Sequence, residues 1–381
     1  MVRAVKISSK KKNSGQLHII PAVFGVSIGV MCIFFLYAFF SDAFGISYYS
    51  ADDGIMRGNQ ISVLPKLDTA DYDRRMQVLA LATTTLPKPA PVATTTATGT
   101  VATTEAAAPL WPANAVYPNA GALLPFNRIV AYYGNFYSRG MGVIGEYSEE
   151  EVLRKLKAEV AVWEAADPTT PVVPAIEYID VTAQESAGSG GLYSLRMPDS
   201  QIDIALKMAK KINGIVILDI QLGLSSLEKE LPLLDTYWKM PNVHLALDPE
   251  FAMHTGAKPG TVIGSMDAVD INYAAQYLAK IVRDYNLPPK ILVVHRFTRP
   301  MVTNYKQIKP LPEVQIIMDM DGWGPPEKKI GTYNAFLNPE PVQFTGVKLF
   351  YKNDLKPPST RLLTPAEILK LIPRPIFIQY Q

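Results

Sequence analysis

The chain has 381 residues, of which 48% are apolar, enough to bury the core of one large domain or of two average ones. Its 37 Lys and Arg residues nearly balance its 35 Asp and Glu residues, so the formal net charge is only +2. More than this whole excess lies in the cations Arg3, Lys6, Lys10, Lys11 and Lys12. Because the remainder of the chain is slightly acidic, the sequence predicts no nucleic-acid partner.

The N-terminus combines a basic segment with a long apolar run. After the predicted cytoplasmic tail at 1–16, no charged residue interrupts the run from Ile19 to Phe40, and an acidic residue, Asp42, follows it. A helix needs roughly 20 apolar residues to span a bilayer. The pattern therefore predicts a single-pass signal anchor at 17–40 in the cell membrane of a bacterial envelope, with the N-terminus in the cytoplasm and the rest extracytoplasmic. A cleaved signal peptide is the alternative, although its apolar region is usually about 7–15 residues long.

Two further segments precede the region that carries the fold. Residues 41–82 form a juxtamembrane segment of mixed polarity, in which Asp68–Leu81 is predicted to be a short helix. Residues 83–112 are mostly Thr, Ala, Pro and Val. Such a composition buries too little apolar surface to offset the entropy of ordering, and it predicts a disordered, extended linker. The sequence places the folded domain at 120–381.

In that domain, short apolar runs alternate with amphipathic helical stretches. The predicted strands are Ile129–Gly134, Val172–Tyr178, Gly214–Gln221, Val243–Asp248, Ile291–His295, Val314–Asp319, Phe344–Tyr351 and Pro375–Gln379. The predicted helices include Ser148–Trp163, a helix introduced by Pro198, Ser226–Lys239, Asp267–Tyr285 and one capped by Thr364. Strands separated by helices pair in parallel through right-handed crossovers.

Two α/β folds fit this alternation, a closed (β/α)8 TIM-like barrel and an open doubly wound sheet. Eight strands over about 260 residues match the usual size of the barrel. A nucleotide-binding open sheet would also carry a Gly-rich turn after its first strand, which this sequence lacks. The sequence therefore favours the barrel.

Polar side chains end most of the predicted strands, where the active site of such a barrel lies. They are Tyr133, Glu177, Asp219, Asp248 with Glu250, His295 with Arg296, and Asp319 with Asp321, which is followed by Trp323. A single Asp after a strand is commonly only the N-cap of the next helix. A polar group at the end of so many strands instead predicts a ligand-binding mouth.

The carboxylates at this mouth suit acid and base catalysis. Crowded carboxyl groups separate their pKa values, so that one donates a proton while another is ionised. Glu250 is the predicted general acid, and Asp248 or Asp219 the predicted base or nucleophile. The predicted substrate-binding residues are Glu177, His295, Arg296, Asp319, Asp321, Trp323 and Tyr133.

The same carboxylates leave a metal alternative open. With one His they would form an oxygen-rich site for a divalent cation such as Mg or Ca, as in a metal-dependent phosphodiesterase. His295 alone among the four histidines lies at the carboxyl end of a predicted strand, and it could also be an ordinary core histidine. The sequence therefore predicts no cofactor and no metal ligand, with the divalent cation as the alternative.

Three segments carry a resemblance to known proteins. Ala131–Gly134, Leu247–Phe251 and Met318–Gly324 resemble segments of a family of uncharacterised exported bacterial proteins, over roughly residues 125–381. With acids at its strand ends, the domain is also similar in general layout to glycoside-hydrolase barrels. This likeness implies a hydrolase-like site but identifies no substrate. The predicted function is hydrolysis of a glycan by carboxylate acid/base catalysis, and a non-catalytic glycan- or peptide-binding module is the alternative.

Overall fold

The computed structural model describes residues 64, 66–81, 109–113, 116–188 and 190–381. The predicted membrane span at 17–40 and nearly all of the predicted linker lie outside these residues. Within the described part of the chain, no helix is both long and apolar enough to cross a bilayer. Everything described falls inside one compact unit, Arg57–Gln381.

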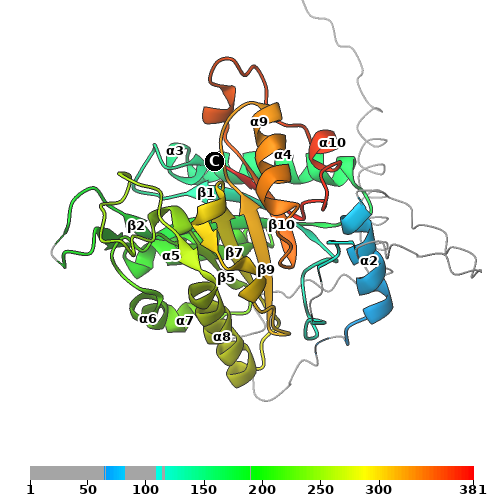
Figure 1. Cartoon of the computed structure of the whole chain (residues 1–381), viewed down its shortest axis with the longest axis horizontal. Coiled ribbons are helices and arrows are strands. Elements are labelled where there is room, and N and C mark those ends of the chain that lie inside the picture. The colour runs from blue at the N-terminus through cyan, green and yellow to red at the C-terminus, as the bar shows by residue number, and fades with distance from the viewer. Residues whose placement is uncertain (1–63, 65, 82–108, 114–115, 189) are drawn as a thin grey trace, which may run out of the picture. The chain divides into compact units, whose positions relative to one another are not determined.

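Eight parallel strands close into a barrel, as the sequence predicts (Figure 1). In order around the barrel they are β1 (Arg128–Gly134), β2 (Val172–Ala183), β4 (Ile215–Ile220), β5 (Val243–Leu247), β7 (Lys290–Arg296), β9 (Val314–Met320), β10 (Phe344–Leu349) and β11 (Phe377–Tyr380). Pairing of β11 with β1 completes the ring, which excludes the open sheet. A short strand, β3 (Ser194–Arg196), adds antiparallel to the extended end of β2.

Helices surround the strands, and the longest ones agree with the sequence (Figure 1). The main ones are α4 (Glu149–Ala166), α5 (Asp199–Lys210), α8 (Ala268–Tyr285) and α9 (Pro326–Thr332), with shorter helices at α3 (Val143–Glu146) and α10 (Pro365–Ile368). Ser148 caps α4 by accepting a hydrogen bond from the Glu151 amide, and Asp267 caps α8. These caps explain why both helices begin where the polar residue precedes the apolar stripe.

One predicted helix is wrong in extent. The stretch Ser226–Lys239 forms two short helices, α6 (Leu227–Glu230) and α7 (Asp235–Trp238), joined by a 3-10 turn at Leu231–Leu234. Pro232 lies in that turn, and proline has no amide hydrogen to donate to the preceding helical turn. The apolar spacing therefore continues through a segment that cannot hold one α-helix.

Alternate residues of the strands belong to two separate cores. Val130 and Tyr132 of β1 pack in a large cluster that includes side chains of the surrounding helices. Ile129 and Ala131 belong to a second cluster, which consists mainly of strand residues and fills the barrel interior. Because successive side chains of a strand point to opposite faces, this alternation identifies which residues of every strand face inward.

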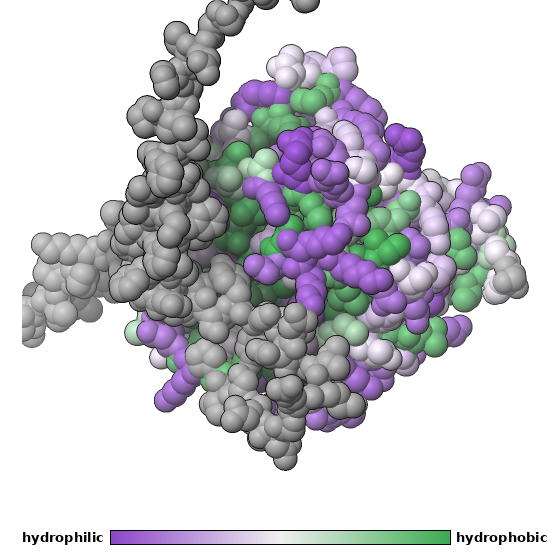
Figure 2. All heavy atoms as spheres, turned by 180° about the vertical axis from the view of Figure 1, so that it is seen from behind, coloured by the Kyte–Doolittle hydropathy of each residue, from purple (hydrophilic) through white to green (hydrophobic). Residues whose placement is uncertain are grey.

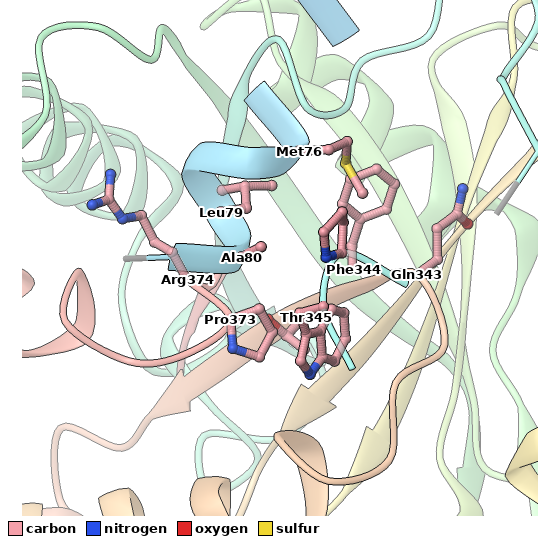
Figure 3. A pocket seen from close by; sticks show the side chains of 10 residues that line it. Met76, Leu79, Ala80, Gln343, Phe344, Thr345, Pro373 and Arg374 are labelled. Atoms are coloured by element: carbon pink, nitrogen blue, oxygen red, sulfur yellow. The ribbon is translucent and has the colours of Figure 1, made fainter. Parts of the chain in front are cut away.

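Helix α2 (Thr69–Leu81) packs against the inner core at the amino end of the barrel. Its buried Tyr72, Met76 and Leu79 belong to the interior cluster, and the Leu79 carbonyl accepts a 2.7 Å hydrogen bond from the Arg374 amide. Met76, Leu79 and Ala80 face Phe344 across a cavity of about 10 Å³, room for one water at most (Figure 3). The helix that the sequence places before the linker thus covers this end of the barrel. On the back of the molecule, hydrophilic and apolar residues are interspersed (Figure 2).

Candidate functional site at the carboxyl end of the barrel

The inward-facing residues at the carboxyl end of the barrel are polar, and those one layer below them are apolar. One inward-facing polar residue from each strand, or from the position just after it, forms what we name the mouth ring: Tyr133, Glu177, Asp219, Asp248, His295, Asp319, Lys348 and Gln379. Two residues before each of them lies Ala131, Ala175, Ile217, Ala246, Val293, Ile317, Gly346 or Phe377. All eight ring residues are at most 4% exposed. A layer of polar side chains therefore lies above a layer of mostly apolar ones inside the barrel.

His295 bridges two carboxylates of the ring. Its Nε2 lies 3.2 Å from Glu177 Oε1, and its Nδ1 lies 3.2 Å from Asp319 Oδ2. Burial alone would lower the pKa of His295, but the hydrogen bonds to Asp319 and Glu177 outweigh it and raise the pKa well above its usual value. The imidazole is therefore a buried cation that holds both carboxylates in place.

Space for this bridge depends on Gly346. A Cβ atom at position 346 would lie 2.5 Å from Asp319 Oδ1 and 2.8 Å from the Phe377 ring. The absence of a side chain at position 346 therefore leaves room for the Asp319 carboxylate. In sequence this glycine is an ordinary small residue in a strand, so its role emerges only from the barrel geometry.

A second network connects other members of the ring. The Tyr133 phenol donates a 2.7 Å hydrogen bond to Asp219 Oδ2, and Gln221 donates to both the Tyr133 oxygen (3.3 Å) and Asp248 Oδ2 (3.4 Å). Gln221 is itself fixed by the Ala183 amide, which donates to its Oε1. Hydrogen bonds through Tyr133 and Gln221 therefore connect Asp219 to Asp248.

The environments of the catalytic candidates raise their pKa values by different amounts. Burial raises the pKa of Asp219 to about 6, although the His295 charge and the Tyr133 hydrogen bond act the other way. Burial, followed by the neighbouring Asp219, raises the pKa of Asp248 well above its usual value. Burial and then Asp321 raise the pKa of Glu250 to about 6. Around neutral pH, the mouth therefore contains both ionised and protonated carboxyl groups.

Glu250 lies at the rim rather than in the ring. It follows Asp248 in a 3-10 turn (Pro249–Phe251), where its amide donates to Asp248 Oδ1. Its side chain is only partly buried. A carboxyl group at this position can meet a ligand that enters from solvent.

Two ring residues were not predicted from the sequence. Lys348 places its Nζ 3.7 Å from the centre of the Tyr133 ring, and its charge offsets the surrounding carboxylates. Gln379 is fully buried, and neither its Nε2 nor its Oε1 has a hydrogen-bond partner among the described residues. Counting every second residue from the inward-facing Phe344 and Phe377 would have found both.

Several carboxylate oxygens in the ring and beside it also lack a hydrogen-bond partner. Within the described part of the chain, Glu177 Oε2, Asp219 Oδ1, Asp319 Oδ1 and Asp321 Oδ1 are buried and accept no hydrogen bond. Burying an acceptor without a donor costs about 1–3 kcal/mol, and more for a charged group. The ring is therefore suited to a ligand that brings several hydrogen-bond donors.

The other predicted site residues lie at three different positions. Asp321 lies close to the ring, its Oδ2 3.9 Å from His295 Nδ1. Trp323 is 48% exposed, and the ammonium groups of Lys328 and Lys356 approach its ring at 5.0 and 5.1 Å. Arg296 is not part of the mouth, because it follows the inward-facing His295 and so points outward, where it pairs with Glu340.

A metal site needs several ligands that converge on one point. Among the described residues, no group of three or more His, Cys, Asp or Glu side chains has that arrangement. The carboxylates of the ring are instead spread around the barrel and engaged by His295, Tyr133 and Gln221.

Comparison with known proteins gives resemblance only at the level of layout. No protein-family model and no curated protein matches the sequence. The crystal structure of the clostridial cellulose synthase subunit Z from Clostridioides difficile is 11% identical, with a TM-score of 0.35, covering 67% of this chain and 91% of its own. A hyperthermophilic endo-beta-1,4-glucanase in complex with substrate is 10% identical, with a TM-score of 0.36, covering 67% of this chain and 89% of its own.

A ruminal endo-beta-1,4-mannanase is also similar, at 11% identity and a TM-score of 0.32, covering 67% of this chain and 59% of its own. With every TM-score below 0.5, the likeness carries no inference about activity, and the resemblance to exported bacterial proteins stays a prediction.

Proposed function

We propose that the barrel hydrolyses an uncharged glycan at the mouth ring by carboxylate acid/base catalysis. The observation that carries this proposal is the separation of carboxyl environments around one network. Tyr133 donates to Asp219 and favours its ionised form, whereas burial and the Asp219 charge favour the protonated form of Asp248. Glycoside hydrolysis needs one carboxyl group in each state beside the sugar bond.

The roles divide according to these environments. Asp219, with a pKa of about 6, is ionised at neutral pH and is our candidate base or nucleophile. Glu250 has the same raised pKa of about 6, so its role follows from its position: partly exposed at the rim, where it can exchange protons with solvent, it is our candidate proton donor to the leaving oxygen. The raised pKa of Asp248 argues against the base role and suits a neutral carboxyl group that donates a hydrogen bond to the substrate.

The charge of the mouth supports an uncharged substrate. Six carboxyl groups (Glu177, Asp219, Asp248, Glu250, Asp319 and Asp321) surround two cationic side chains, His295 and Lys348. An anionic substrate would meet repulsion there unless a divalent cation accompanied it, as a phosphodiesterase would require. Sugar hydroxyl groups instead supply the donors that the unpartnered ring oxygens lack, and the exposed Trp323 offers a ring face for stacking.

The test is turnover by the purified full-length chain on a panel of envelope and plant polysaccharides, measured as new reducing ends. Release of reducing ends from an uncharged polymer supports the proposal. Saturable binding with no release would favour the glycan-binding module, and turnover only of phosphodiesters with added Mg or Ca would favour the phosphodiesterase. We further propose that the 17–40 anchor holds this barrel at the extracytoplasmic face of the membrane.

A further inference from the structure

A second polar hollow lies at the opposite end of the barrel from the mouth ring. Its cavity volume is about 90 Å³, several times the roughly 10–15 Å³ that a single water needs. It is lined by Arg74, Arg75, Val78 and Leu79 of α2, by Pro125, by Asp167, Thr169 and Thr170 after α4, and by Arg374 and Ile376 before β11. We name it the basal hollow.

Some guanidinium N–H groups of the arginines at the basal hollow make no hydrogen bond to the described residues. Arg74 and Arg75 share one carboxylate, Asp71, and Arg75 reaches it through its Nε. Arg374 is only 5% exposed and uses its Nε to donate to the Leu369 carbonyl. Its two terminal nitrogens make no hydrogen bond to any described residue. Figure 3 shows the Arg374 side chain pointing away from the apolar cavity beneath α2.

Asp167, the carboxylate that lines the hollow, already accepts several hydrogen bonds. Asp167 accepts hydrogen bonds from the Thr169 and Thr170 hydroxyl groups and from Arg128 Nη2 at 2.9 Å. Arg128 is fully buried, its guanidinium lies 5.1 Å from the centre of the Trp163 ring, and its Nε and Nη1 have no hydrogen-bond partner among the described residues. Burial lowers the pKa of Arg128, and the nearby Arg374 charge acts in the same direction.

The charges of the hollow therefore do not balance. Three guanidinium groups line the hollow, those of Arg74, Arg75 and Arg374, and its lining carboxylate, Asp167, already pairs with Arg128 behind it. Arg74 and Arg75 share Asp71, so two of the positive charges at the hollow, one of them on the nearly buried Arg374, have no carboxylate of their own. A buried charge without a counter-charge is costly.

We propose that the basal hollow binds a tetrahedral oxyanion, a phosphate or sulfate group, between α2 and the base of the barrel. The cavity has room for such a group, and guanidinium groups pair with its oxygens in bidentate fashion. Arginines from α2 and from the segment before β11 would then hold the same anion. The bound group would fasten the helix to the barrel, in a site separate from the mouth ring.

The experiment is calorimetric titration of the full-length chain with inorganic phosphate, at constant ionic strength set with KCl. We expect saturable binding by the wild type, and affinity at least about tenfold weaker for Arg374→Gln and for the double variant Arg74→Gln/Arg75→Gln. Asp71→Asn should tighten binding, because it frees guanidinium donors and removes a negative charge. Arg154→Gln, an exposed arginine paired with Glu151 on α4, is the matched control and should leave the affinity unchanged.

Absence of saturable phosphate binding by the wild type would overturn the site. Equal weakening by Arg154→Gln and by the α2 pair would overturn it as well, since the effect would then be one of overall charge. If Arg374→Gln does not fold, the affinity of the Arg74→Gln/Arg75→Gln variant alone tests the site. Titration with glycerol phosphate identifies the source: binding with the same variant pattern assigns an esterified phosphate, and no binding assigns the free ion.

Discussion

Tyr133 of β1 donates its phenolic hydrogen to Asp219 of β4, across the intervening strand β2, at 2.7 Å. Both side chains are almost completely buried, so the hydrogen bond acts in a medium where charge is weakly screened. It opposes the effect of burial, which on its own would keep Asp219 protonated to a higher pH. This contact therefore lowers the pH at which the proposed base becomes available.

Replacing Tyr133 by Phe should move the acidic limb of the activity profile to higher pH. Loss of a donor to a carboxylate costs its ionised form about 1.5–3 kcal/mol, or roughly 1–2 pKa units. Asp219 would then ionise later as the pH rises, and kcat/KM would fall below pH 7. The matched control is Tyr117→Phe, which also removes a 2.7 Å phenol–carboxylate hydrogen bond, to Asp73, but leaves the ring intact. An unchanged limb in Tyr133→Phe would contradict the assignment.

Removing the Asp219 charge should stabilise the fold at neutral pH. The folded pKa of about 6 lies above the ordinary value of 3.8, so the folded state binds the proton more tightly. Stability is therefore greatest below the unfolded pKa, falls as the pH rises from about 4 to 6, and stays low above 6. Asp219→Asn should gain up to about 3 kcal/mol at pH 7.5, at about 1.4 kcal/mol per pKa unit, and almost nothing at pH 4.

Thermal unfolding at both pH values measures this difference. Asp284→Asn, on the exposed end of α8, provides the comparison, because its carboxylate is exposed and pairs with the exposed Lys280. A gain from Asp219→Asn that is the same at pH 4 and pH 7.5 would mean that burial does not raise this pKa.

The substitution Gly346→Ala should disturb the mouth ring, because position 346 lies one layer below it in the barrel. The added methyl group meets Asp319 and Phe377 at distances that force one of them to move. Overpacking of this kind costs about 1–3 kcal/mol, and displaced Asp319 would loosen His295. Gly331→Ala, where nothing lies within 4 Å of the new atom, is the control and should be neutral or slightly stabilising in α9. Equal melting temperatures for the two variants would refute this account of Gly346.

Helix α2 should contribute substantially to the stability of the barrel. Met76 is 6% exposed and packs on the interior cluster, so Met76→Ala should cost about 2–3 kcal/mol. Its neighbour Gln77 is exposed, and Gln77→Ala should change stability by no more than about 0.5 kcal/mol. Denaturant unfolding compares them, and equal midpoints would show that α2 is not part of the cooperative unit.

The strands and most of the ring follow from sequence patterns alone. In four of the barrel strands an interior polar residue follows buried apolar residues near the carboxyl end, which identifies Glu177, Asp219, His295 and Asp319. This pattern does not identify Lys348, because Leu349 and Phe350 continue the apolar run after it. Arg296 was grouped with His295 because adjacent polar residues resemble one unit in sequence, although a strand points them to opposite faces.

Other features depend on contacts that no local pattern encodes. The packing of α2 on Phe344 and the unbalanced arginines around Asp167 each join segments more than 90 residues apart. The sequence identifies the helix and the arginines separately. Their meeting follows only from closure of the barrel, which brings the start of β10 and the segment before β11 beneath α2.

The most direct test of the proposed function is the effect of Asp219→Asn on glycan hydrolysis, with Asp284→Asn as the control. The substrate is whichever uncharged polysaccharide the wild type cleaves fastest. Loss of the base or nucleophile should lower kcat by about 10²–10⁴-fold, while the control retains wild-type kcat. A wild-type kcat in Asp219→Asn, or no cleavage of any uncharged glycan by the wild type, would contradict catalysis at the mouth ring.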